Sequence, residues 1–136
     1  MKKKLNCILL VDDNHADNHF HRIIIKGMNI AEHIEVALNG MEAINFLNKE
    51  NQTPPELIFL DINMPKMNGW EFLDAYKNLD AKQKSKVIIM MLTTSSNPLD
   101  VERAKQIEEV TGYEVKPLTE EMLNEILAQH FSEDTN

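Results

Sequence analysis

Polar residues that could do chemistry stand at the ends of short apolar runs in this chain. The runs 7–11, 57–60 and 87–92 are continuous and apolar, and they lead into Asp12-Asp13, Asp61 and Thr93-Thr94. A weaker run at 113–115 leads into Lys116-Pro117. Continuous runs of this length are typical of parallel strands that helices bury on both faces. Because the carboxyl ends of parallel strands share one edge of the sheet, we expect these polar groups to form one site.

Three carboxylates at such an edge would repel one another. Neighbouring strands lie about 4.8 Å apart, so Asp12, Asp13 and Asp61 would come within roughly 5 Å if their strands are adjacent. At an effective dielectric constant near 20, each like-charged pair costs on the order of 3 kcal/mol. Protonation, a cationic side chain or a metal must offset that cost, and Lys116 offers one positive charge. A hard divalent cation such as Mg²⁺ is the natural complement, because it prefers oxygen ligands.

The same set of groups suits a phosphoryl group. A divalent cation, a lysine and a hydroxyl donor together stabilise phosphoryl transfer. No serine–histidine or cysteine–histidine pair stands at these strand ends, and the residues after Asp13 do not form a glycine-rich phosphate loop. A bound nucleotide is therefore not expected, and a carboxylate nucleophile that forms an acyl phosphate is the favoured mechanism.

The segments between the runs carry the period of amphipathic helices. Apolar residues recur three or four positions apart within 16–27, 43–47, 72–76, 101–107 and 122–127. With weaker strand candidates at 34–37 and 113–115, the sequence predicts five strand–helix units. This alternation implies right-handed crossovers and a doubly wound α/β sheet with helices on both faces. We expect Gly40 and Gly69 just before the second and third helices, Pro98 at the start of the fourth, and Thr119 as the cap of the last.

Composition limits the class of protein further. The chain has 136 residues, a net charge of −8 and 43% hydrophobic residues, which fits one globular domain. The acidic balance argues against nucleic acid or a membrane surface as partner, and the single Cys7 allows no internal disulfide. The apolar run near the N-terminus is too short for a signal peptide. We expect a cytoplasmic protein, with one domain over residues 1–131 and a tail over 132–136.

Taken together, these motifs resemble the receiver domains of response regulators in bacterial two-component systems, of the single-domain type found in chemotaxis. The matching stretches are Ile8-Leu9-Leu10-Val11-Asp12-Asp13, Leu60-Asp61-Ile62-Asn63-Met64-Pro65, Asn68-Gly69, Leu92-Thr93-Thr94 and Val115-Lys116-Pro117-Leu118-Thr119. They extend over nearly the whole chain without a large insertion. The resemblance implies a flavodoxin-like (βα)5 three-layer sandwich with strand order 2-1-3-4-5.

The resemblance also implies roles for individual residues. Asp61 matches the phosphoacceptor that takes a phosphoryl group from a histidine of a sensor kinase or of a phosphotransfer protein. Asp12 and Asp13 match the acidic pair that holds Mg²⁺, with Asp61 and the backbone carbonyl of Asn63 as further ligands. Lys116 matches the lysine that bridges to the phosphoryl oxygens.

Two further residues match the switch of the family. Thr93, rather than its neighbour Thr94, resembles the hydroxyl that moves towards the phosphoryl group. Tyr113 resembles the aromatic residue that turns inward with it. By the family pattern the Lys116–Pro117 peptide bond is cis.

The resemblance also indicates how the signal would leave the domain. We expect no output domain after Phe131, so the signal would pass through protein contacts or by onward transfer to a histidine. The contact face would comprise the predicted helix 101–107, the strand 113–115 and the helix 122–127. The downstream protein stays unknown, and a monomer or a weak dimer is expected.

Other interpretations of the same residues stay open at this point. Asp12 and Asp13 are also favoured helix caps, Lys116 is of a type that is usually solvated, and Tyr113 would equally suit a sheet edge. His15, His19 and His21 in the first predicted helix are expected to be exposed.

Two other functions compete with the receiver hypothesis. A Mg²⁺-dependent phosphohydrolase would use Asp61 as its nucleophile, although Asn63 then stands where such enzymes commonly carry a general acid. An inactive receiver that serves only as a scaffold is disfavoured because every expected site residue is present. We expect no enzymatic activity beyond self-phosphorylation and dephosphorylation at Asp61.

Overall fold

The computed structural model describes residues 4–49, 54–80 and 87–131. The strands are β1 (Leu5–Val11), β2 (Ala31–Ala37), β3 (Leu57–Leu60), β4 (Ile88–Thr93) and β5 (Val110–Val115). The helices are α1 (His15–Met28), α2 (Gly40–Asn48), α3 (Gly69–Lys77), α5 (Pro98–Lys105) and α6 (Glu120–His130). Strand and helix alternate along the chain as the periodicity predicts. The tail predicted over residues 132–136 lies outside the described residues.

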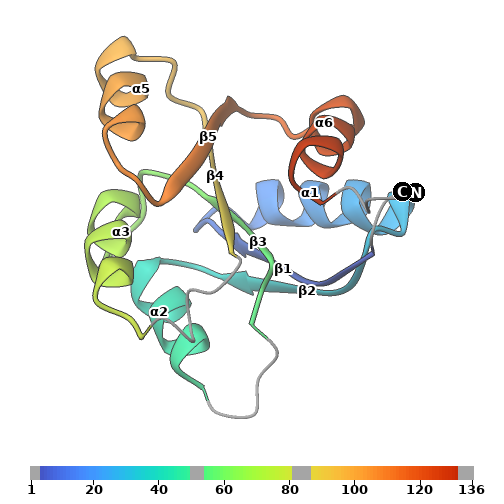
Figure 1. Cartoon of the computed structure of the whole chain (residues 1–136), viewed down its shortest axis with the longest axis horizontal. Coiled ribbons are helices and arrows are strands. Elements are labelled where there is room, and N and C mark those ends of the chain that lie inside the picture. Colours follow the sequence, from blue (N-terminus) through green and yellow to red (C-terminus); the bar gives the residue numbers. More distant parts are fainter. Residues whose placement is uncertain (1–3, 50–53, 81–86, 132–136) are drawn as a thin grey trace.

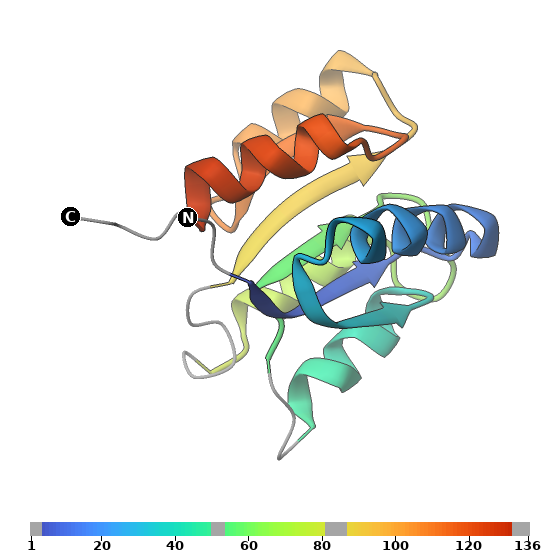
Figure 2. The same ribbon diagram turned by 90° about the vertical axis from the view of Figure 1, so that its right-hand side faces the viewer.

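All neighbouring strands pair in parallel, in the order β2-β1-β3-β4-β5. This confirms the doubly wound sheet and the strand order that the resemblance implied. At the carboxyl end of the central strands, Val11 pairs with Leu60, and Leu60 pairs with Met91. Figure 2 shows the strand arrows running towards one edge of the sheet. The residues that follow β1, β3 and β4 therefore meet at that edge.

Helices cover both faces of the sheet, and each face has its own apolar cluster (Figure 1). On one face, Ile25 of α1 and Leu123 of α6 pack against the strands. On the other face, Ala43 of α2, Phe72 of α3 and Ala104 of α5 do the same. Burial of this kind stabilises a fold by about 25 cal/mol for each Å² of apolar surface removed from water. The two clusters hold the strand ends in fixed relative positions.

Burial differs between the central and the outer strands. Every residue of β3 is buried, and so is every residue of β1 except Asn6. In β2 only Ala37 is buried, and no residue of β5 is. A strand with only one neighbour keeps part of its surface in water, which explains why these two runs gave the weaker sequence signals. The strands that carry Asp12 and Asp61 are thus the most enclosed.

The helix starts differ in detail from the prediction. Gly40 and Gly69 are the first residues of α2 and α3, and Asn39 and Asn68 are the caps before them. An asparagine cap accepts a hydrogen bond from a free backbone N–H of the first turn, which a glycine cannot do. The predicted cap Thr119 is confirmed, since its Oγ1 accepts from the N–H of Met122 at 3.1 Å.

The alternative interpretation of Asp12 and Asp13 as helix caps is wrong. The N-cap of α1 is Asn14, whose Oδ1 accepts from the N–H of Asp17 at 3.0 Å. The two acidic residues lie before the cap and are available for other contacts. Among the described residues, no helix has the length and apolar character needed to cross a bilayer.

Candidate functional site

Three carboxylates come together where β1 and β3 end. Oxygen atoms of Asp12, Asp13 and Asp61 lie within 4.8 Å of one another, which is the separation that the sequence predicts. Asp12 and Asp61 are buried, at 5% and 9% exposure, whereas Asp13 is exposed. We name these three residues together with Lys116 the acidic centre.

Backbone hydrogen bonds fix the two buried carboxylates in position. The N–H of Asp61 donates to the carbonyl of Val11 at 2.9 Å, which continues the ladder between β1 and β3 past the last strand residue. Oδ1 of Asp61 accepts from the N–H of Ile62 at 2.8 Å, and Oδ1 of Asp12 accepts from the N–H of Asn14 at 2.9 Å. In both residues the other oxygen, Oδ2, is left to face Lys116.

Lys116 lies among carboxylates. Its Nζ is 2.6 Å from Oδ2 of Asp12, 3.1 Å from Oδ2 of Asp61 and 2.7 Å from Oδ2 of Asp17. Its side chain is only 7% exposed. The interpretation of Lys116 as an ordinary solvated lysine is therefore wrong. The structure brings it to Asp12 and Asp61 as predicted and adds Asp17, which the sequence analysis did not identify.

Burial and ion pairing act in opposite directions on these groups. Burial raises the pKa of Asp12 above its ordinary value, and the hydrogen bonds from Lys116 and from the N–H of Asn14 offset this only in part. Burial alone would lower the pKa of Lys116, but its hydrogen bonds to Asp12 and Asp17 outweigh that effect and raise it. The lysine therefore stays charged, as a contact with a phosphoryl group requires.

The donor set fits a divalent cation. Three carboxylates in close proximity offer the hard oxygen ligands that Mg²⁺ prefers, and the exposed Asp13 leaves one side open to water, which Mg²⁺ keeps in its coordination shell. Asn63, the further ligand that the resemblance implied, is exposed in the loop after β3. The residues present therefore suit the metal.

Hydroxyl groups surround the end of β4. Thr93 is completely buried and its Oγ1 accepts from the N–H of Ser95 at 3.3 Å, while Thr94 is exposed. Tyr113 of β5 donates its phenol O–H to the carbonyl of Ser95 at 2.8 Å, and the Oγ of Ser95 lies 2.6 Å from Oδ2 of Asp100 in α5. We name Thr93, Ser95, Asp100 and Tyr113 the hydroxyl corner.

The hydroxyl corner is joined to the acidic centre through the backbone. The N–H of Lys116 donates to the carbonyl of Thr93 at 2.8 Å. Burial raises the pKa of Tyr113, so the phenol keeps its proton and remains a donor to Ser95. The Lys116–Pro117 peptide bond is cis, as the family pattern implied.

A glycine permits close packing under the carboxylate loop. A Cβ atom at Gly69 would lie only 2.3 Å from the backbone oxygen of Asp61, closer than any real contact. The N–H of Gly69 donates to the carbonyl of Ile62 at 2.8 Å. The start of α3 thus rests directly on the backbone that carries Asp61.

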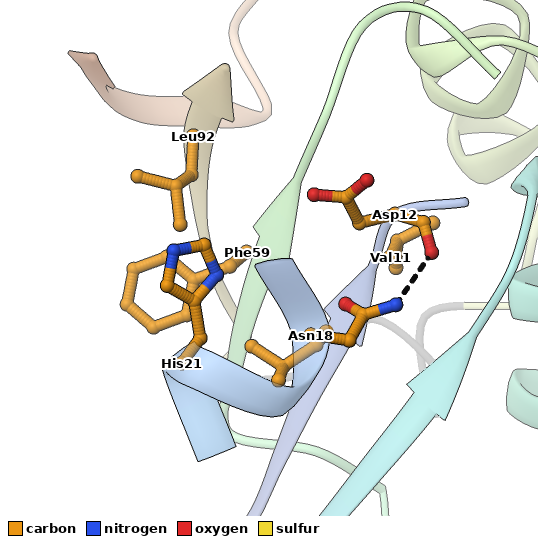
Figure 3. Close-up of a pocket in the computed structure, with 7 residues that line it drawn as sticks. Val11, Asp12, Asn18, His21, Phe59 and Leu92 are labelled. Atoms are coloured by element: carbon orange, nitrogen blue, oxygen red, sulfur yellow. Dashed lines mark hydrogen bonds between the residues drawn. The ribbon is translucent and has the colours of Figure 1, made fainter. Parts of the chain in front are cut away.

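One histidine of α1 differs from the sequence expectation. His15 and His19 are exposed as predicted, but His21 is only 2% exposed, so its predicted exposure is wrong. The N–H of Leu118 donates to Nε2 of His21 at 3.4 Å, and burial lowers the pKa of this histidine. Figure 3 shows His21 beside Asn18, whose Nδ2 donates to the carbonyl of Asp12 at 2.8 Å. The inner face of α1 therefore supports both the β1 end and the Lys116 loop.

Comparison with known proteins gives a consistent result. The sequence profile of the family described as response regulator receiver domain matches residues 8–128. Response regulator Rcp1 of Synechocystis sp. is 37% identical over 99 residues, which make up 69% of this chain and 65% of Rcp1. The chain thus spans just under two thirds of that relative.

Solved structures share the fold. A two-component response regulator from Cytophaga hutchinsonii superposes with a TM-score of 0.86, at 35% identity and over 93% of this chain and 97% of that one. The phosphorylated cyanobacterial phytochrome response regulator RcpA superposes with a TM-score of 0.73, at 30% identity and over 91% of this chain and 89% of that one. The Mn²⁺-bound form of Rcp1 superposes with a TM-score of 0.67, at 28% identity and over 90% of both chains.

Proposed function

The chain belongs to the family of response regulator receiver domains, and on that premise we propose that it is a phosphorylation-dependent signalling module. Asp61 accepts a phosphoryl group from a histidine of a sensor kinase or of a histidine phosphotransfer protein. The single observation that carries this proposal is the contact of Lys116 Nζ with both Asp12 and Asp61 inside a three-carboxylate cluster. A buried cation shared between two carboxylates suits a site where further negative charge arrives.

Asp61 is the nucleophile in the proposed transfer. An oxygen of its carboxylate attacks phosphorus, and a P–O bond forms while the P–N bond of the phosphohistidine breaks. The electron pair of the P–N bond returns to the imidazole, which takes a proton from solvent. In the separate hydrolysis step water attacks phosphorus and releases a proton to solvent, the P–O bond to Asp61 breaks, and its electron pair restores the carboxylate while phosphate leaves.

The other residues of the acidic centre position and neutralise the reacting groups. Asp12, Asp13, Asp61 and the carbonyl of Asn63 would hold Mg²⁺, which when bound supplies positive charge to the phosphoryl oxygens. Lys116 would donate a hydrogen bond to a phosphoryl oxygen. Its raised pKa keeps it protonated throughout the neutral pH range. Such preorganised charge is commonly the largest contribution to phosphoryl transfer.

The hydroxyl corner is the proposed readout. Thr93 is the residue whose hydroxyl would move to the phosphoryl group, and doing so requires Oγ1 to release the N–H of Ser95. Tyr113 holds the carbonyl of the same Ser95, so a change at Thr93 is passed to β5. The face formed by α5, β5 and α6 then binds a downstream protein, or Asp61 passes the phosphoryl group on to another histidine.

The phosphohydrolase alternative finds little support at the site. The residue two positions after Asp61 is Asn63, an amide that does not titrate and cannot act as a general acid. The proposed module therefore turns over only its own acyl phosphate. As an isolated domain it is expected to be a monomer or a weak dimer.

The test is the intact mass of the protein after incubation with a small acyl-phosphate donor. We expect one added phosphoryl group in the presence of Mg²⁺, none with EDTA, and none in Asp61→Asn. The matched control is Asp74→Asn, which removes one exposed carboxylate on α3 and should leave the adduct unchanged. Absence of an adduct in the wild-type protein, under conditions where Mg²⁺ binds, would overturn the proposal. Multiple turnover of small phosphomonoesters would favour the phosphohydrolase instead.

A further inference from the structure

Asp17 is a fourth carboxylate at the site, and none of the roles above uses it. It lies in the first turn of α1 and forms an ion pair with Lys116. Its Oδ2 is 2.7 Å from Nζ of Lys116, shorter than the 3.1 Å between that nitrogen and Oδ2 of Asp61. The contact joins residues 99 positions apart in the sequence. Asp17 is therefore a tight partner of the lysine that the proposed reaction needs.

The donors of Lys116 are fully used by these contacts. An ammonium group has three N–H donors and no acceptor, and three carboxylate oxygens lie at 2.6, 2.7 and 3.1 Å. A phosphoryl group on Asp61 brings three strong acceptor oxygens and roughly two negative charges. Lys116 can direct more than one donor to that group only by releasing Asp12 or Asp17.

Asp17 is the partner that can be released at lower cost. The side chain of Asp12 is 7% exposed, so water has little access to replace the lysine, and without a bound cation the buried charge would lose its partner, which is strongly destabilising. The side chain of Asp17 is 34% exposed, so water can replace the lysine as its donor. Asp17 is also not one of the three carboxylates whose oxygens lie within 4.8 Å of one another. Its contact is thus with Lys116 and not with the three-carboxylate cluster.

We propose that Asp17 competes with the phosphoryl group for Lys116 and thereby weakens the hold of the site on that group. This proposal rests on the function proposed above and assigns a specific regulatory residue to it. While Asp61 is unphosphorylated, Asp17 occupies the third N–H donor of Lys116, beside the donors taken by Asp12 and Asp61. Once the phosphoryl group is present, the carboxylate of Asp17 remains a competing acceptor and a nearby negative charge, so the phosphorylated state is less favoured than it would be with a neutral residue.

The test measures binding of trifluoroberyllate, an anionic phosphoryl analogue, at saturating Mg²⁺ by fluorine NMR. We expect Asp17→Asn to bind it roughly tenfold more tightly than the wild-type protein, since one charge-assisted hydrogen bond is of that order. Asp17→Ala, which removes the acceptor altogether, should gain at least as much. Asp74→Asn, which makes the same change in net charge away from the lysine, should change the affinity by less than about twofold.

A second measurement separates competition for Lys116 from a structural effect. Mg²⁺ affinity in the absence of trifluoroberyllate should change by less than about threefold in Asp17→Asn, whereas Asp13→Asn should lose most of it. Unchanged or weaker trifluoroberyllate binding by both Asp17 variants would overturn the inference, and so would an equal gain in Asp74→Asn. If the wild-type protein itself binds no trifluoroberyllate and forms no adduct, the proposed function fails, and that outcome is distinct from the failure of this inference.

Discussion

At the ends of β1 and β3, the buried carboxylates of Asp12 and Asp61 are fixed by backbone hydrogen bonds, whereas hydroxyl groups beside β4 and β5 hold the loop that follows β4. The three carboxylates of the acidic centre follow two strands that are buried almost throughout. The hydroxyl corner adjoins β5, which has no buried residue, and the β4–β5 pairing shifts register between Ile89 and Met90. Asp12 and Asp61 are buried and paired with Lys116, whereas Ser95, Asp100 and Tyr113 of the hydroxyl corner are half-buried, beside the buried Thr93.

This difference suits a division of labour. Phosphoryl transfer requires groups that are held in place before the reaction, and the central strands provide that. A readout requires an element whose local stability is low enough to change, which is typical of segments with few buried contacts. The proposed chemistry thus lies at the ends of the most buried strands, and the proposed response lies beside the less buried edge strand β5.

Removal of Lys116 should produce the largest effect and tests the acidic centre. We expect Lys116→Ala to react with a small acyl-phosphate donor about 10²-fold to 10³-fold more slowly than the wild-type protein, which is the loss typical for one electrostatic donor. Rates come from intact mass against time, and circular dichroism checks that the variant is folded, because Asp12 and Asp61 lose their cation. Lys26→Ala on α1 is the control. A rate within tenfold of wild type would show that the acidic centre does not depend on its lysine.

Alkylation of Cys7, which lies on β1, compares how accessible the buried strands and the edge strand β5 are to a reagent. Burial raises the pKa of this thiol from 9.0 to about 11, so at a given lower pH its reactive thiolate should be about 100-fold scarcer than normal. The pKa of Cys7 is higher in the folded state than in the unfolded chain, so protonation of this thiol favours folding. Its contribution to the free energy of unfolding is complete below pH 9.0 and is lost as the pH rises through about 11. We expect alkylation near pH 8 to be at least 100-fold slower than in the unfolded chain.

The matched control places a thiol on the edge strand. Thr111 is exposed on β5, so Thr111→Cys in a Cys7→Ser background should react at the rate of a solvated thiol. The comparison would be broken if the two cysteines reacted at rates within tenfold of each other.

Loosening the hydroxyl corner should have the smallest effect. Tyr113→Phe loses the 2.8 Å hydrogen bond to the carbonyl of Ser95, which should lower the free energy of unfolding by about 1 kcal/mol. Urea denaturation measures this loss. Tyr76→Phe, at a buried residue of α3, serves as the control. The phosphorylation rate should stay within about threefold of wild type, since the phenol O–H of Tyr113 donates to the carbonyl of Ser95 and not to the acidic centre. A tenfold fall in that rate would contradict the separation of chemistry from readout.

The acidic triad could be predicted because its signal is local. Asp12-Asp13 and Asp61 each follow a continuous apolar run, and the parallel sheet that such runs build brings their ends together by geometry alone. The closeness of Lys116 to Asp12 followed from the same argument. The receiver fold and its strand order were likewise accessible from the alternation of periods and from the resemblance.

Asp17 and His21 were not predicted, because their partners are distant in the chain. Lys116 lies 99 positions from Asp17, and Leu118 lies 97 positions from His21. The sequence did hold one usable signal, since Asn18, His21 and Ile25 recur at helical spacing and all face inward. The histidine within this stripe was nevertheless predicted to be exposed. Side-chain contacts across the sheet edge required the folded structure.

The close approach of Gly69 to the backbone of Asp61 matters for protein engineering. The loop after β3 carries Asp61, and the start of the next helix, α3, packs directly against its backbone. Transplanting residues 61–68 alone would deliver the carboxylate without the surface on which it rests, and any side chain at position 69 would push against that backbone. The smallest unit that can be grafted is therefore the loop together with the capped first turn of α3.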